Sequence, residues 1–343
     1  MKHRILIIYT GGTIGMIQDP STHTLRPFDF SHLIDNVPKI KMLDYDIDHI
    51  QFNPPIDSSN VSPQHWQLLA SEIGRNYDKY DGFVVLHGTD TMAYTASALS
   101  FMLEHLNKPV IITGSQLPIG EVRTDGEENL ITALQIAAER DPVNGEPMVQ
   151  EVAILFENYL WRGNRATKMS ADNFNAFKSN NYPSLAKIGL SIQFHNESLW
   201  RVHDRMPLRV HTGLDTNVLI VYVHPGLTEA SLRQQLDTPG VKGIVLKTYG
   251  AGNGPTFPWF CDAIRRAVDR GIVIINVTQC PNGGVHQKRY FTGDMLARAG
   301  VLSGHDITTE AALTKMMFLF GMGLSGKQVA HRLVHPICGE MTL

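Results

Sequence analysis

The chain has 343 residues, of which 43% are hydrophobic and 18% are charged, and its formal net charge at pH 7 is −3. This length exceeds the size at which one hydrophobic core usually keeps growing, so we expect two domains. The small net charge, and the lack of any apolar run as long as a membrane span, give no sign of a nucleic-acid or membrane partner, and we expect neither.

The cysteines and the first residues indicate a cytoplasmic protein. An odd number of cysteines, all in the last third of the chain, argues against a disulfide framework and is typical of a reducing compartment. These cysteines are Cys261, Cys280 and Cys338. The charged start of the chain is followed by apolar residues 5–8, but this stretch is too short for a signal peptide and runs into two glycines. We therefore predict a first β-strand there.

In the first half of the chain, short β-branched runs alternate with longer segments of helical periodicity. This alternation is typical of βαβ units and predicts an α/β fold with a mostly parallel sheet flanked by helices. We assign residues 1–192 to an N-terminal catalytic domain of this kind. Its expected helices are residues 92–106 and 125–140, the second with Asp125 as its N-cap. Its expected strands are residues 4–10, 82–87, 109–113 and 152–156.

A second βα series begins near residue 217. The stretch before it is polar and weakly periodic, so we predict a linker over residues 193–213 and a smaller C-terminal α/β domain over residues 214–343. The expected strands of this domain are residues 218–223, 243–246 and 272–277, and its expected helices lie around Ala230, Ala263, Ala311 and Gln328.

Three apolar runs of the first series stop at a glycine flanked by hydroxyl residues. They read TGGT at residues 10–13, GTD at 88–90 and TGS at 113–115. If these runs are neighbouring parallel strands, their carboxyl ends meet at one edge of the sheet, where open α/β folds place ligand sites. Several weakly nucleophilic hydroxyl groups would then share one pocket, which indicates acyl transfer to a hydroxyl.

The first two motifs also have other interpretations. Paired glycines let the backbone turn sharply and approach a ligand. The sequence GGTIG departs from the dinucleotide fingerprint G-x-G-x-x-G, no Walker A pattern occurs, and a plain structural turn stays open. At the second motif, Thr89, Asp90 or Thr91 could cap a helix. Capping needs only one such side chain, so three in a row favour a functional site.

Lys168 follows the fourth expected strand and closes the sequence RGNRATK. Taken alone, it is most simply a solvated lysine. Buried beside Thr89 and Asp90, however, a neutral amine could accept a proton. A threonine, a lysine and an aspartate would then repeat the nucleophile, base and orienting acid of serine triads.

Two loops have both an ordinary and a functional interpretation. Residues 57–60 have the composition of a turn, yet Ser58 could hydrogen-bond a polar substrate. Residues 19–27 are polar and bounded by prolines, as in an ordinary surface loop or in a mobile lid over Thr13. The sequence alone leaves both questions open.

Three residues near the C-terminal end have the spacing of metal ligands: His331, His335 and Cys338. The H-x-x-x-H pattern lacks the inner glutamate of zinc proteases, and Pro336 ends the helix before the cysteine. We expect amphipathic packing here, and no metal site.

In this order and at these separations, the three motifs resemble those of the bacterial L-asparaginases, and the resemblance covers nearly the whole chain. Residues 57–59, 94–102 and 249–253 are most similar to the cytoplasmic type I branch. The resemblance implies hydrolysis of L-asparagine to L-aspartate and ammonia without a cofactor, with some glutaminase activity. It also implies a homodimer or homotetramer.

The resemblance further implies roles for single residues. Thr13 matches the threonine that attacks the amide carbonyl, and Thr89, Asp90 and Lys168 match a second triad. Which threonine attacks first stays open. A threonine hydroxyl is a poor nucleophile until a base removes its proton, and the backbone amides of glycine turns can polarise the amide oxygen. The positions that match the substrate-binding set are Gly12, Ser58, Ser59, Gly88, Asp90, Ser115 and Gln116.

The chain departs from the family pattern in two places. The family's helper tyrosine often stands shortly before a proline in the lid, whereas residues 22–27 read THTLRP. Some type I enzymes bind a second asparagine at a regulatory site through an arginine, where this chain has Lys247; lysine lacks the bidentate fork that grips a carboxylate. Asparagine activation is the corresponding expectation, with Thr167, Lys247, Asn253 and Cys280 as candidate residues.

Two rival functions follow from the same residues. The first is an amidohydrolase for a bulkier amide, as in the transamidation subunits of this superfamily. Those subunits usually carry an extra N-terminal domain, whereas the first motif begins at Tyr9 here, and this difference weighs against the rival. The second is a non-catalytic amino-acid sensor, which would keep Ser58 and Asp90 but would not need Thr13, Thr89 and Lys168 together.

Overall fold

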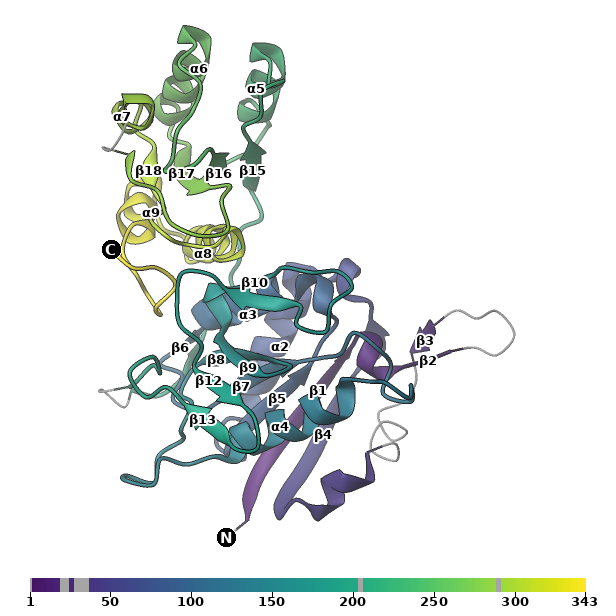
Figure 1. Ribbon diagram of the computed structural model, residues 1–343. Helices are drawn as coiled ribbons and strands as arrows, with labels where there is room; N and C mark the ends of the chain where they lie inside the picture. The colour runs from purple at the N-terminus through teal and green to yellow at the C-terminus, as the bar shows by residue number, and fades with distance from the viewer. Residues whose placement is uncertain (1, 19–24, 28–36, 203–205, 288–290) are drawn as a thin grey trace. The chain divides into compact units, whose positions relative to one another are not determined.

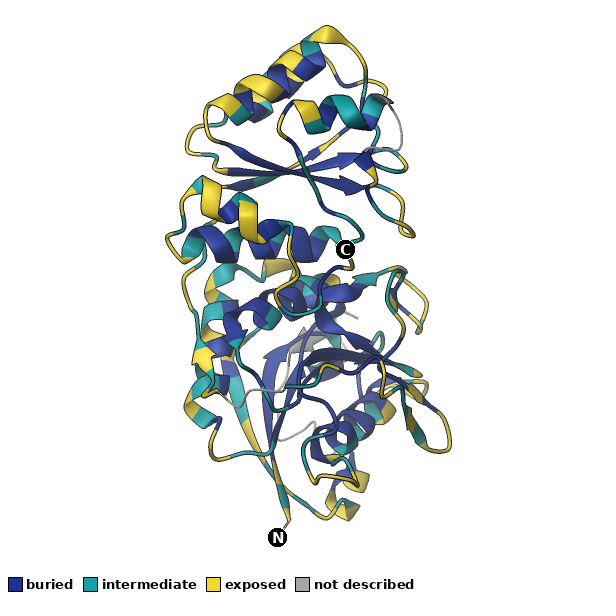
Figure 2. Ribbon diagram, turned by 90° about the vertical axis from the view of Figure 1, so that its left-hand side faces the viewer, coloured by how far each residue is buried: buried dark blue, intermediate teal, exposed yellow. Residues whose placement is uncertain are grey.

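A computed structural model describes residues 2–18, 25–27, 37–202, 206–287 and 291–343 of the chain. The chain forms two compact units, residues 1–212 and 213–343. Figure 2 shows that the strands of both units are largely buried, whereas their helices also carry exposed residues. Among the described residues, no helix is both long enough and apolar enough to cross a membrane.

The first unit contains an eight-stranded sheet with the strand order β13-β12-β9-β8-β7-β5-β1-β4 (Figure 1). Its five strands from β4 to β8 are parallel, and β9, β12 and β13 continue the sheet antiparallel. The predicted mostly parallel sheet is therefore confirmed. The strands are β1 (His3–Gly11), β4 (Tyr45–Ile56), β5 (Gly82–Leu86), β7 (Val110–Thr113), β8 (Val152–Phe156), β9 (Tyr159–Arg162), β12 (Ala186–Ile188) and β13 (Ile192–Phe194).

The three strands that precede the glycine motifs are neighbours, as predicted, and they end at the same level. Tyr9 of β1 pairs with Leu86 of β5, and Leu86 pairs with Thr113 of β7. All residues of β5, β7 and β8 are buried, as expected for parallel strands covered on both faces. This register brings the three motifs to one edge of the sheet.

Helices cover the sheet, and two of their expected ends need correction. The helices are α2 (Pro63–Asn76), α3 (Met92–Met102) and α4 (Gly126–Ala138). The helix predicted over 92–106 ends at Met102, because the next two residues form β6 (Leu103–Glu104), which pairs with β14 (Arg209–Val210). The helix predicted over 125–140 ends at Ala138; Asp125 stands at its N-cap, as predicted, but the side chain makes no capping hydrogen bond.

Several short elements connect the strands of the first unit. Two antiparallel ribbons pair β2 (Met16–Gln18) with β3 (Leu25–Pro27), and β10 (Ala166–Lys168) with β11 (Phe177–Ser179). Single 3-10 turns follow or precede the strands: η1 (Thr13–Gly15), η2 (Pro38–Met42), η3 (Ser58–Asn60), η4 (Thr89–Thr91) and η5 (Gly163–Arg165). Within the expected linker of 193–213, β13 and β14 pair with strands of the first unit.

The second unit has a four-stranded parallel sheet with its own core. Its strands are β15 (Val218–Tyr222), β16 (Gly243–Thr248), β17 (Val273–Thr278) and β18 (Leu302–Ser303). Its helices are α5 (Glu229–Leu236), α6 (Pro258–Asp269), α7 (Phe291–Arg298), α8 (Thr309–Gly321) and α9 (Gly326–Leu333). The core combines β-branched residues of the strands with the apolar faces of α5 and α6.

Candidate active site

The carboxyl end of β1 turns into the first motif at two glycines with positive φ. Gly11 has a φ of 128° and Gly12 a φ of 89°, a region that residues with a Cβ rarely adopt. A Cβ on Gly12 would lie 2.4 Å from the backbone nitrogen of Gly88. The first turn therefore lies directly against the second motif, and this close approach requires glycine.

Thr13 opens η1, and a side chain of β1 braces this turn. The fully buried Tyr9 donates its hydroxyl to the carbonyl of Gly15 at 2.9 Å. The backbone N–H of Gly15 in turn donates to the carbonyl of Gly12 at 3.1 Å. The position of Thr13 is thus coupled to the central sheet through one buried phenol group.

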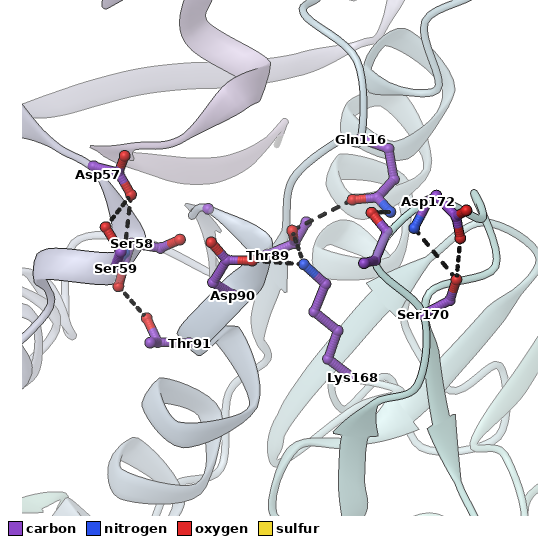
Figure 3. A network of polar contacts seen from close by, with 12 residues as sticks. Asp57, Ser58, Ser59, Thr89, Asp90, Thr91, Gln116, Lys168, Ser170 and Asp172 are labelled. Atoms are coloured by element: carbon purple, nitrogen blue, oxygen red, sulfur yellow. Dashed lines mark hydrogen bonds and ion pairs between the residues drawn. The ribbon is translucent and has the colours of Figure 1, made fainter.

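The turn that follows β4, η3, contacts the second motif. The hydroxyl of Thr91 donates to the carbonyl of Ser58 at 2.7 Å, and a Cβ on Gly88 would lie 2.5 Å from Ser58 Oγ. Asp57 caps η3 by accepting hydrogen bonds from the backbone and the hydroxyl of Ser59, at 2.9 and 2.8 Å. Figure 3 shows this turn beside the threonine motif. Ser58 is buried in the site, whereas Ser59 is exposed and turned toward Asp57.

Lys168, the last residue of β10, brings its amine to the second motif. Its Nζ lies 2.8 Å from Oγ1 of Thr89 and 2.7 Å from Oδ1 of Asp90 (Figure 3). The 3-10 turn η5 and β10 both contact α3, the helix that follows Thr89 and Asp90. The structure therefore brings Lys168 to two adjacent residues from which it is separated by 79 and 78 positions of sequence. Thr167 precedes the lysine in the same strand.

The arrangement around Lys168 suits proton transfer at a hydroxyl. Both of its distances lie within the hydrogen-bond reach of about 2.6 to 3.2 Å that a general base needs. In the structure the amine of Lys168 donates to the Thr89 oxygen. A neutral amine in the same place can accept a hydroxyl proton, and the carboxylate of Asp90 then stabilises the ammonium that forms. The side chain of Lys168 is 19% exposed, so the amine is largely shielded from bulk water.

Gln116 connects the second motif to the loop after β10. The hydroxyl of Thr89 donates to Oε1 of Gln116 at 3.3 Å, and Nε2 of Gln116 donates to the carbonyl of Asn173 at 3.0 Å (Figure 3). The neighbouring Ser115 is buried, and its hydroxyl donates to the carbonyl of Leu117. Gln116 thus faces the threonine, whereas the hydroxyl of Ser115 stabilises its own turn.

A buried histidine lies behind the second motif. Nδ1 of His87 donates to the carbonyl of Gly88 at 2.7 Å, and its Nε2 accepts from the hydroxyl of Thr95 at 2.9 Å. Trp66 donates its indole N–H to the same hydroxyl at 2.9 Å. Burial lowers the pKa of His87 to about 4, so the ring is neutral at pH 7 and carries its proton on the nitrogen that faces Gly88.

Some of these contacts have no signal in the sequence. Trp66 and Thr95 lie on the buried faces of their helices, and no pattern in the neighbouring sequence predicts that they contact His87. Asp125 does stand out, but as a helix cap. The structure instead directs its carboxylate to the backbone of Gln116 and Leu117, which corrects that interpretation.

Three of the candidate regulatory residues lie in the second unit. Lys247 is buried, and its amine donates to the carbonyl of Thr278 and, at 2.8 Å, to the hydroxyl of Thr309. This burial lowers the pKa of Lys247. Asn253 bonds through its backbone to the loop after β16, and Cys280 is exposed.

The remaining expectations concern a metal and a lid. His335 donates through Nδ1 to the carbonyl of His331 at 2.8 Å. Within the part of the chain that the structure describes, no three His, Cys, Asp or Glu side chains, Cys338 included, are placed to share a metal ion. Of the expected lid, residues 19–24 lie outside the described residues, and residues 25–27 form β3.

Comparisons with known proteins agree with this fold. The family model for "Asparaginase, N-terminal" matches residues 4–200, and the model for "Glutaminase/Asparaginase C-terminal domain" matches residues 217–333. The matches span both units and define an α/β amidohydrolase with two domains. The chain belongs to the asparaginase family.

Individual relatives cover the whole chain. It is 42% identical over 344 residues to L-asparaginase 1 of Escherichia coli (strain K12), which covers 99% of this chain and 98% of that protein. The crystal structure of L-asparaginase I from Vibrio cholerae superposes with a TM-score of 0.89 at 40% identity, covering 100% of both chains. A glutamyl-tRNA(Gln) amidotransferase subunit from Methanobrevibacter smithii is 32% identical over 99% of this chain and 77% of its own length.

Proposed function

We propose that this protein hydrolyses L-asparagine to L-aspartate and ammonia through a threonine nucleophile. The names of its relatives support the substrate, and one geometric observation supports the chemistry. This observation is the amine of Lys168 within hydrogen-bond distance of both Thr89 Oγ1 and Asp90 Oδ1. Such an amine can move a proton to and from a hydroxyl, which a threonine nucleophile requires.

In this proposal, Thr13 attacks the side-chain amide. Its oxygen forms a bond to the amide carbon, the carbon–nitrogen bond breaks, and the nitrogen leaves as ammonia after taking up a proton. Water then cleaves the resulting ester, which releases aspartate and restores the hydroxyl. The triad of Thr89, Lys168 and Asp90 moves the protons, and backbone N–H groups of the glycine turns polarise the carbonyl oxygen.

The proposal assigns the remaining site residues to substrate binding. Ser58 and Asp90 hold the α-amino and α-carboxylate groups, together with Ser59, Gln116 and the backbone groups of Gly12, Gly88 and Ser115. Glutamine has the same head groups and one more methylene. We therefore propose weak glutaminase activity as a side reaction.

A substitution series tests the nucleophile. Replacing Thr13 or Thr89 by valine removes one hydroxyl at nearly constant volume, and each change should lower ammonia release from asparagine by about 100-fold or more. Thr238→Val, in the second unit, is the matched control and should keep full activity. Normal turnover by both site variants would reject the proposal. Asparagine binding in a calorimeter without any ammonia release would instead indicate the amino-acid sensor.

A second candidate substrate is an amide on a larger molecule. The similarity to the M. smithii amidotransferase protein over nearly the whole chain supports this second candidate substrate. A substrate panel distinguishes the two proposals. Free asparagine should be hydrolysed faster than glutamine, and both faster than a peptide that carries an internal asparagine.

We also propose a cytoplasmic homodimer or homotetramer, which light scattering of the purified protein would distinguish. Asparagine activation through Thr167, Lys247, Asn253 and Cys280 stays a prediction. An effector carboxylate would have to draw the amine of Lys247 away from Thr278 and Thr309. A sigmoidal dependence of rate on asparagine concentration would support activation, and a hyperbolic one would reject it.

A further inference from the structure

We infer that Asp125 is a positioning residue for the amide hydrolysis: its carboxylate fixes the backbone of Gln116, and Gln116 in turn orients the hydroxyl of Thr89. This inference rests on the proposed function, because it concerns the reaction in which Thr89 takes part.

The carboxylate of Asp125 gathers several donors from the third motif. Both of its oxygens accept the backbone N–H of Gln116 at 3.0 Å, and Oδ1 also accepts the backbone N–H of Leu117 at 3.2 Å. Its Oδ2 accepts from Nδ2 of Asn129 at 3.3 Å. Asp125 is 8% exposed, so these bonds are shielded from competing water.

The backbone on the other side of Gln116 is held as well. Asn129, one turn into α4, donates through Nδ2 to the carbonyl of Gly114 at 3.0 Å. Its Oδ1 accepts the backbone N–H of Glu157 at 3.1 Å, which anchors the amide at the end of β8. Asp125 and Asn129 together therefore fix the chain before and after Gln116.

The side chain of Gln116 starts from this fixed backbone and ends at the triad. Its Oε1 accepts the hydroxyl of Thr89, and its Nε2 is bound to the carbonyl of Asn173. The Thr89 oxygen in turn accepts a hydrogen bond from the amine of Lys168, so Gln116 and Lys168 fix its position from two sides. If the third motif shifted, Gln116 would release the hydroxyl, and a displacement of about 1 Å in such a site can lower turnover on the order of 100-fold.

A carboxylate suits this task better than any neutral side chain of the same shape. An ionised carboxylate only accepts hydrogen bonds, so it can face several N–H groups at once. The isosteric asparagine would turn its own NH2 group toward the N–H of Gln116 or of Leu117. One buried donor would then lose its acceptor, and the loop would shift to satisfy it.

A double-mutant cycle tests the inference. We expect Asp125→Asn to lower kcat for asparagine roughly 10- to 100-fold, with KM changed less than about threefold. Gln116→Ala should lower kcat as well. In the double variant, Asp125→Asn should add less than about a twofold further loss, because its effect passes through a side chain that is already absent.

Asp215→Asn is the matched control. Asp215 also holds a turn, by accepting the backbone and side-chain N–H groups of Asn217, but it lies in the second unit. It should change kcat little, and its effect should multiply with that of Gln116→Ala. If the kcat losses of Asp125→Asn and Gln116→Ala multiplied in the double variant, the inference would be overturned. It would also be overturned if Asp125→Asn lowered the melting temperature and left kcat per folded site unchanged.

Folding of the variant and activity of the unsubstituted protein also affect the result. If Asp125→Asn does not fold, Asp125→Glu replaces it in the cycle, since it keeps the charge but moves the carboxylate relative to the N–H groups of Gln116 and Leu117. It should show the same dependence on Gln116, and an independent effect would overturn the inference. If the unsubstituted protein releases no ammonia from asparagine, the proposed function and the inference both fail. An active protein with independent effects rejects the inference alone.

Discussion

Both units place a lysine and several hydroxyl groups near the carboxyl ends of their strands, yet the partners of these groups differ. In the first unit, the amine of Lys168 bonds to two side chains, the hydroxyl of Thr89 and the carboxylate of Asp90. In the second unit, the amine of Lys247 bonds to the carbonyl of Thr278 and to a hydroxyl of α8. The residue types are similar, and their surroundings are not.

The strand-end hydroxyl groups of the second sheet bond to carbonyl and amide groups. Thr278 donates to the carbonyl of Gly250 at 2.6 Å. Thr248 donates to the side-chain oxygen of Asn276 at 2.5 Å, and that amide donates to the carbonyl of Gly252 at 2.9 Å. Carbonyl and amide groups accept hydrogen bonds but do not serve as general bases, whereas a neutral amine can accept a proton from a hydroxyl. Thr248 and Thr278 therefore donate to groups that cannot act as bases, whereas Thr89 lies beside an amine.

Removing the amine of Lys168 is the strongest way to break this comparison. Lys168→Met keeps most of the apolar stem, and we expect kcat to fall on the order of 1000-fold, as for the loss of a general base. Lys242→Met, which removes a half-buried ion pair with Asp215 in the second unit, should retain full kcat. The measurement is steady-state ammonia release from asparagine. If Lys168→Met kept a third or more of the activity, the amine would have no part in proton transfer.

Lowering the pH should reduce the stability of the protein through His87, the buried histidine behind the second motif. In the unfolded chain His87 takes up a proton near its ordinary pKa of 6.5, whereas in the folded chain burial lowers its pKa to about 4. Protons therefore favour the unfolded chain between these values, and stability falls as the pH falls from 6.5 to 4. The loss is at most about 3 kcal/mol, at about 1.4 kcal/mol per pH unit.

The control for this pH effect is His87→Gln, which removes the titrating ring. Urea unfolding of both proteins at pH 7 and at pH 4.5 gives the change in free energy of unfolding for each. The unsubstituted protein should lose more stability than the variant over this interval. Equal losses would show that His87 is protonated as easily in the folded chain as in the unfolded one.

The smallest effect should come from the second sheet. Thr248→Val leaves the buried Asn276 without its hydroxyl donor, and we expect a loss of about 1 to 3 kcal/mol in the free energy of unfolding. The kcat per folded site should stay unchanged, because no group of the triad is altered. A loss of kcat as large as that of Thr89→Val would show that the two strand-end networks do not differ in kind.

The sequence predicted the central strands of the first unit well and its edges poorly. Strands β1, β5, β7 and β8 are continuous apolar runs because they are buried on both faces. The edge strand β4 reads YDIDHIQFNPPI, and its charges and prolines conceal it from a search for apolar runs. Strands β9, β12 and β13 were missed as well, since they extend the sheet antiparallel and two of them have only three residues.

The candidate site could be predicted as a set of residues, but its internal contacts could not. Helical capping potential near Asp125 is a local property, and it gave a wrong role for the side chain, because the nearest unsatisfied N–H groups belong to a loop eight and nine residues away. The contact between His87 and Trp66 through Thr95 depends on how α2 and α3 pack, which no local pattern encodes.

What the sequence by itself determined is the alternation of strands and helices and the type of residue at each strand end. Backbone propensity, burial periodicity and the freedom of Gly11 and Gly12 are properties of neighbours along the chain. What only the tertiary structure decided is which polar group meets which. Lys168 reaches Thr89 across 79 positions of sequence, and such a contact is set by strand order and register, because those alone bring distant residues within hydrogen-bond distance.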